Sequence, residues 1–205
     1  ARREYDAALR AGRTPIFVGG TGYYINAIIN GISPMPDIDD AVRARARELV
    51  TTDIDVARRM LPPEFTATDP QRVARGVEVF LQTGRHITEF QNMPRTGAVA
   101  PAAFKILINP PLDVLRARIA ARIPKMLSGG AAAEGRAVID SGWDARRAIG
   151  AAQMVAYLRG EIDMDTCVQN WITKTNQYAK RQRTWFRTQF AADIVLDSAD
   201  APITF

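Results

Sequence analysis

Apolar residues recur at every third or fourth position over most of the chain, the spacing that places them on one face of a helix. Glycines follow several of these stretches, as is common where helices end. Pro124 lies inside one stretch and is predicted to bend or interrupt it. The pattern predicts helices over residues 2–11, 23–30, 40–51, 53–60, 70–83, 113–127, 131–140, 150–159 and 163–189.

Three short apolar runs are predicted to be strands, namely Pro15–Val18, Phe104–Asn109 and Ile194–Leu196. The first run is continuously apolar, as is typical of a parallel strand that is buried on both faces. A helical pattern follows it directly, and this strand-then-helix order predicts an α/β fold. The strand Pro15–Val18 cannot form a sheet by itself, so we expect a segment that precedes it to supply the remaining strands.

Proline-rich and glycine-rich stretches divide the predicted elements into three regions. A proline-punctuated linker runs over 33–40, and an irregular segment from Asn92 to Pro101 follows the next group of helices. We therefore predict that 1–33 is part of an α/β core and that 34–100 is a helical insertion. Residues 101–205 are predicted to return to the core and to end in a long basic helix.

The composition is that of an ordinary globular protein, with 47% hydrophobic and 24% charged residues. A net charge of +5 fits a nucleic-acid partner, although arginine-rich proteins of many functions share such a charge. No apolar run approaches the roughly 20 residues of a membrane span, and we expect a cytoplasmic protein. The single cysteine, Cys167, and the single histidine, His86, argue against a disulfide or a zinc site. We interpret them as a buried thiol and a surface histidine.

A glycine-rich corner, Val18-Gly19-Gly20-Thr21-Gly22, follows the first predicted strand. Glycines permit a sharp turn and leave the backbone N–H groups open to a ligand. The helix that follows offers unpaired N–H groups and a positive dipole end, which suits an anion. The alternative is a tight turn that binds nothing, and the loop alone does not decide between the two.

The last predicted helix carries a basic stripe, because Lys180, Arg183 and Arg187 lie within about 60° of one another on a helical wheel. Positions 176, 179 and 184 hold no acidic residue that could pair with them, so an external polyanion is a suitable counter-charge. A solvated helix face is the alternative. Trp171, Tyr178 and Trp185 fall on another arc, which we predict to be core.

These stretches together resemble the tRNA dimethylallyltransferases, which prenylate the adenosine next to the anticodon. The resemblance rests on Gly19–Thr21 with the following Tyr-Tyr, on Asn30–Ile32, on Asp69–Arg72 and on 179–187. It implies a P-loop NTPase-like three-layer core, here without its N-terminal strands. The family's phosphate-binding loop, G-P-T-x-S-G-K-S/T, and the catalytic aspartate after it are absent from this sequence. We therefore expect that the chain by itself does not catalyse the transfer.

The resemblance also implies roles for individual residues. Thr21 would lie near the reacting base, and Arg122 would steady the departing diphosphate, although helical periodicity does not single out Arg122. Ala151-Ala152 stands where the family carries a tyrosine or a larger polar residue, which implies fewer contacts to RNA there. The implied substrate-binding residues are Gly19, Gly20, Arg43, Gln71, Arg72, Arg75, Arg147, Ile149, Gly150, Lys180, Arg181, Gln182, Arg183, Trp185 and Arg187.

The implied partners are a tRNA anticodon stem-loop and dimethylallyl diphosphate, and the implied cofactor is Mg²⁺ with its ligands outside this chain. We expect a monomer that has no contact with membranes. Two alternatives remain open: an RNA-binding remnant without catalysis, and a nucleotide kinase-like phosphotransferase. The phosphotransferase would require a P-loop and would leave the basic helix unexplained. The arginines within 70–83 are interpreted as tRNA contacts. The alternative is that they are solvated charges on the side of the helix that faces away from its apolar residues.

Overall fold

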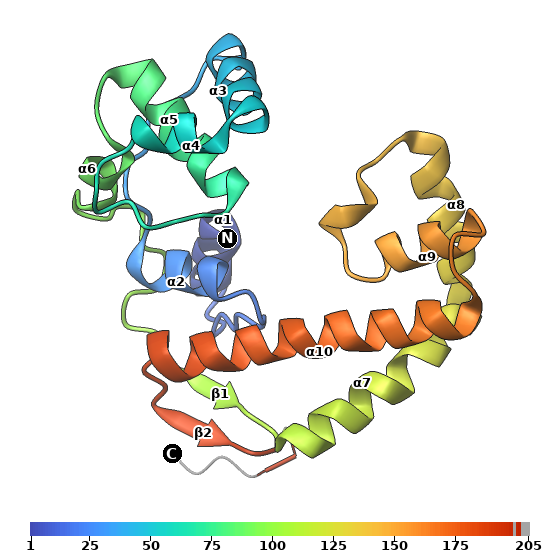
Figure 1. The fold of residues 1–205 in the computed structure, drawn as a ribbon. Helices are drawn as coiled ribbons and strands as arrows, with labels where there is room; N and C mark the ends of the chain where they lie inside the picture. Colours follow the sequence, from blue (N-terminus) through green and yellow to red (C-terminus); the bar gives the residue numbers. More distant parts are fainter. Residues whose placement is uncertain (199, 202–205) are drawn as a thin grey trace. The chain divides into compact units, whose positions relative to one another are not determined.

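The periodic stretches fold as helices in a computed structural model, which describes residues 1–198 and 200–201 (Figure 1). The chain divides into two units. The first consists of Ala1–Gly19 and Tyr23–Ala103, and the second of Gly20–Gly22 and the residues from Phe104 onward. The predicted domain boundary at 33/34 falls inside the first unit, whereas the boundary at 100/101 lies close to the junction at Ala103.

The first unit is built from short helices. Its core joins Ala46, Ala57, Leu61, Val73 and Val77, because the apolar face of α5 packs on α3 and α4. Its helices are α1 (Arg2–Arg10), α2 (which begins at Gly22 and ends at Asn30), α3 (Asp40–Thr52), α4 (Ile54–Arg59), α5 (Pro70–Thr83) and α6 (Ile87–Gln91).

The second unit combines helices with a small parallel sheet, in which Ile106 is paired with Ile194. Helices α7 and α10 run side by side (Figure 1), and Ile123, Met154 and Trp171 belong to the core between the helices. The elements are β1 (Ile106–Ile108), α7 (Leu112–Met126), η1 (Leu127–Ala131), α8 (Ala132–Ser141), η2 (Ala145–Arg147), α9 (Ala151–Leu158), α10 (Met164–Gln189) and β2 (Ile194–Leu196).

The structure confirms an α/β chain, but the predicted strand Pro15–Val18 is wrong. Among the described residues, the only sheet pairs β1 with β2, and Ile16 and Val18 are 81% and 94% exposed. A strand needs a neighbour that satisfies its backbone N–H and C=O groups, and no described segment pairs with this one. The three-layer core stays a prediction.

Three smaller predictions also need correction. Helix α7 continues through Pro124, and the kink comes instead at Gly130, where φ is +110°. Tyr178 lies partly in solvent rather than in the core, since only Trp171 of the aromatic arc is buried. His86 is half-buried, because its ring stacks on Phe80 with 5.0 Å between the centroids. Helix α6 was not expected, since its single turn is too short to show a period.

Candidate nucleic-acid interface

The start of α5 presents two of the predicted RNA contacts. The Asp69 carboxylate accepts hydrogen bonds from the backbone N–H groups of Gln71 and Arg72, both at 3.1 Å. Pro70 occupies the first helical position, where its missing N–H costs nothing. This cap fixes the first turn of α5, and the side chains of Gln71 and Arg72 point into solvent.

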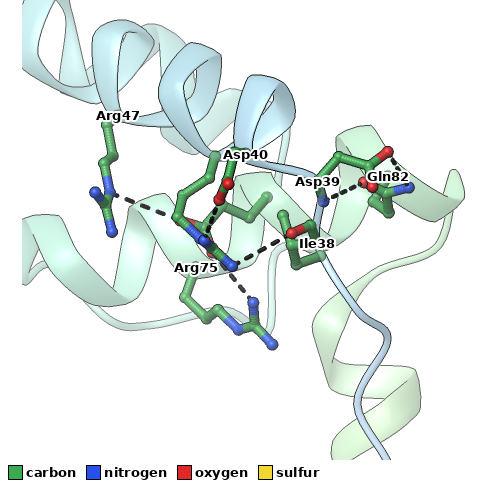
Figure 2. A network of polar contacts seen from close by, with 8 residues as sticks. Ile38, Asp39, Asp40, Arg47, Arg75 and Gln82 are labelled. Atoms are coloured by element: carbon green, nitrogen blue, oxygen red, sulfur yellow. Dashed lines mark hydrogen bonds and ion pairs between the residues drawn. The ribbon is translucent and has the colours of Figure 1, made fainter.

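Arg75 does not lie free, because it pairs with the buried carboxylate of Glu78 (Figure 2). Arg75 Nη1 lies 3.1 Å from Glu78 Oε2, and Arg47 Nε of α3 lies 4.0 Å from Glu78 Oε1. The Glu78 side chain is only 7% exposed, whereas that of Arg47 is 67% exposed. One buried carboxylate thus orients two guanidinium groups from neighbouring helices. The sequence analysis missed both Glu78 and Arg47.

Arg43 is also oriented by its own helix. Its guanidinium pairs with the Asp40 carboxylate at 2.6 Å and donates to the Ile38 carbonyl at 3.3 Å (Figure 2). Such an exposed pair adds little stability, because solvent screens it. Its effect is to orient the Arg43 side chain on α3, which also carries Arg47 and packs against the helix of Arg75, α5.

Replacing Glu78 with lysine is expected to lower the free energy of unfolding by about 3 kcal/mol. The new ammonium group would be buried beside Arg75 and Arg47, which would lose their shared carboxylate. Glu48→Lys makes the same charge change at an exposed position of α3 and is the control, with an expected change below about 0.5 kcal/mol. Urea unfolding measures both variants, and equal losses would contradict the structural role of Glu78.

In the second unit, the backbone of Gly20–Gly22 touches α10 closely. Gln182 Nε2 donates to the Gly20 carbonyl at 2.7 Å. A Cβ added at Gly22 would lie 2.3 Å from the Trp185 ring. Gly20 and Gly22 are not among the residues with positive φ, so these two glycines serve close approach rather than a left-handed turn. A Cβ added at Gly19 would meet nothing within 4 Å, so close packing does not explain that glycine. Gln182 and Trp185 therefore hold the loop in place, with Thr21 exposed between its glycines.

The basic stripe of α10 is only partly open. Arg183 donates to the Pro110 carbonyl, so its guanidinium fastens α10 to the end of the strand segment. Arg181 lies over the Tyr178 ring, 5.7 Å from its centroid, and Lys180 and Arg187 are exposed. Within residues 1–198 and 200–201, none of these four cations has a carboxylate within 4.0 Å. The stripe therefore offers uncompensated positive charge.

Arg147 and Ile149 lie on the surface, whereas Gly150 is buried. Ile149 is 40% exposed, and Arg147 ends the short helix η2 with its side chain in solvent. Gly150 has φ of +95°, and a Cβ there would lie 2.3 Å from the Trp171 ring. The backbone of Gly150 thus packs closely against Trp171 and positions the exposed residues beside it. Its role as a direct RNA contact stays a prediction.

The remaining candidates show no special chemistry. Arg122 is an exposed side chain next to the buried Ile123 of α7, and its contact to diphosphate stays a prediction. Burial raises the pKa of the Cys167 thiol, as expected for a core cysteine.

The described residues contain no group of three His, Cys, Asp or Glu side chains able to hold a metal ion. None of their helices is both long and apolar enough to cross a membrane.

Comparison with known proteins points to one family. The family model for IPP transferase matches residues 1–189. A tRNA dimethylallyltransferase of Acidiphilium cryptum is 40% identical in a match that covers 91% of this chain and 61% of that protein. Another, of Paramagnetospirillum magneticum, is 35% identical in a match that covers 95% of this chain and 65% of that protein. The chain thus spans less than two thirds of the length of these curated relatives.

Two solved structures share the fold. The tRNA isopentenylpyrophosphate transferase of Bacillus halodurans superposes with a TM-score of 0.58 at 26% identity, over 95% of this chain and 63% of that one. The corresponding transferase of Staphylococcus epidermidis gives a TM-score of 0.58 at 24% identity, over 97% of this chain and 68% of that one. The fold similarity therefore extends over nearly the whole chain.

Proposed function

Because this chain belongs to the IPP transferase family, we propose that it functions in tRNA modification as a tRNA dimethylallyltransferase, and that without the family's phosphate-binding loop and catalytic aspartate the chain by itself does not catalyse the transfer. The substrate would be the adenosine 3′ of the anticodon, and dimethylallyl diphosphate would donate the prenyl group. The match of the family model over residues 1–189 carries this proposal. The relatives named as tRNA dimethylallyltransferases support it at 35% and 40% identity.

The exposed cations support tRNA as the partner. Arg72 at the start of α5 and Lys180, Arg181 and Arg187 on α10 are exposed, and each lacks a carboxylate within 4.0 Å in the described part of the chain. RNA phosphates would supply the missing negative charge, with release of bound counter-ions. We accordingly propose a cytoplasmic protein that meets its tRNA as a monomer.

The proposed reaction forms a bond between adenine N6 and the first carbon of the prenyl group. The bond from that carbon to the diphosphate oxygen breaks, and the diphosphate departs with its electron pair. The proton lost from N6 passes to a general base, which the family supplies with the aspartate that is absent from this sequence. The base must first leave its stack, which costs a few kcal/mol that RNA contacts would offset. Thr21 would hydrogen-bond near the flipped base, and Arg122 would stabilise the charge of the diphosphate. The described residues hold no cluster suited to Mg²⁺, and we assign it no step here.

Binding to an anticodon stem-loop tests the proposal. Two RNAs are compared, one with the target adenine and one with guanine at that position, between about 50 and 200 mM salt. We expect salt-sensitive binding that is stronger with adenine, and a roughly fivefold loss of this preference in Thr21→Val, since one hydrogen bond is worth about 1 kcal/mol. Binding without a preference would leave only an RNA-holding surface, and absence of binding would overturn the proposal.

A further inference from the structure

A hollow of about 340 Å³ lies between α8, η2 and α9, all within the second unit. Neither Thr21 nor Arg122 lines it, so it is separate from the residues proposed for the transfer. Its volume falls at the lower end of the range for small-ligand sites. Apolar side chains of α8 and α9 line part of it, namely Val138, Ile139, Ala152, Val155 and Ala156.

Trp143 also lines the hollow and is 44% exposed. Gly142, with φ of +65°, ends α8 and turns the chain, and the Trp143 N–H then donates to Ser141 Oγ at 3.4 Å. Tryptophan is enriched at interfaces, where its apolar ring can be covered while its N–H stays hydrogen-bonded. Trp143 therefore brings exposed aromatic surface to the hollow.

The charged groups around the hollow are already paired. Arg146 donates from Nε and Nη2 to the Asp144 carboxylate at 2.9 and 3.1 Å, and these bonds lower the pKa of Asp144. Arg159 Nη1 lies 4.0 Å from Glu161 Oε1. Such a site suits a planar, uncharged and polar-edged ligand better than an anion, because its lining combines apolar side chains, an aromatic ring and neutralised polar groups.

A nucleobase has these properties, and RNA-binding proteins commonly stack unpaired bases on aromatic side chains. Arg147 follows the lining residue Arg146 directly and is exposed without a carboxylate within 4.0 Å in the described part of the chain, so it is available to an RNA phosphate. We propose that the hollow receives one unpaired base of the bound tRNA, other than the target adenine, stacked on Trp143. This inference rests on the proposed function, since it requires tRNA to be the partner.

Abasic substitution in the RNA tests the inference. Each loop nucleotide of the stem-loop is replaced in turn by an abasic one, and binding is measured for the wild-type chain and for Trp143→Leu. Leucine keeps an apolar side chain at position 143 but cannot stack on a base. We expect one position other than the target where the abasic change weakens wild-type binding about tenfold and leaves Trp143→Leu unaffected. Trp143→Phe should retain most of the effect, because phenylalanine still stacks.

Leu112→Ala, at an exposed apolar position of α7 outside the hollow, is the control and should bind every RNA as the wild type does. If all abasic positions affect the wild type and Trp143→Leu equally, while the wild type still prefers adenine at the target position, the stacking site is wrong and the proposed function stands. If the wild-type chain binds no stem-loop, both are overturned.

Discussion

Replacing Gly150 with alanine is expected to lower the free energy of unfolding by about 2–5 kcal/mol. Two penalties combine at this position. The φ of +95° lies outside the range that residues with a Cβ readily adopt, which costs about 1–2 kcal/mol. The new Cβ would also lie 2.3 Å from the Trp171 ring, which is 4% exposed within the core and cannot yield without displacing its neighbours. Overpacking of this kind costs a further 1–3 kcal/mol or so.

Gly160→Ala separates the two penalties. Gly160 has φ of +73°, and a Cβ there meets nothing within 4 Å, so only the backbone term applies. We expect this variant to lose about 1–2 kcal/mol. Urea unfolding of both variants gives the comparison. If Gly150→Ala costs no more than Gly160→Ala, then close packing against Trp171 is not the reason for a glycine at position 150.

Replacing Lys180, Arg181 and Arg187 together with alanine is expected to weaken stem-loop binding by on the order of 100-fold at physiological salt. The three cations are uncompensated on α10, and each phosphate contact adds about 0.7–0.9 to the slope of log affinity against log salt. We therefore expect that slope to fall by about 2. Binding measured over a salt series gives both quantities. Arg183 is left in place because it fastens α10 to the Pro110 carbonyl.

The control variant also removes three positive charges, but from another part of the chain. Arg3, Arg10 and Arg13 are exposed in and after α1, and their triple alanine variant should change the salt slope by less than half as much. Both variants should unfold at the same urea concentration as the wild type, since exposed substitutions alter stability little. Equal salt slopes in the two triple variants would show that α10 holds no RNA phosphates and that only net charge matters.

Sequence patterns predicted the helices well because the signals for a helix act over one or two turns. Asp69 and Pro70 begin α5, and Gly84, with φ of +69°, ends it at the expected place. These capping contacts join residues that are near neighbours in the chain. The strand at Pro15–Val18 was predicted wrongly for the same reason. A local apolar run carries no information about whether another strand lies beside it.

The residues of the candidate site show the same difference between local signals and contacts that form only on folding. Residue types and their order along the chain were enough to indicate the family, the exposed arginine at position 72 and the basic side of α10. Only the tertiary structure showed that Glu78 is buried and reaches Arg47 of α3, that Arg183 bonds to Pro110 and that Gln182 holds Gly20.

The physical reason is the range of the forces involved. Hydrogen bonds within a helix and at its caps join residues a few positions apart, so a single sequence determines them almost completely. Packing depends on which surfaces meet after folding, and Gln182 and Gly20 are 162 positions apart. The sequence by itself thus determined the helices and the chemistry available to this protein. The tertiary structure decided which of those groups hold the fold together and which remain open to a partner.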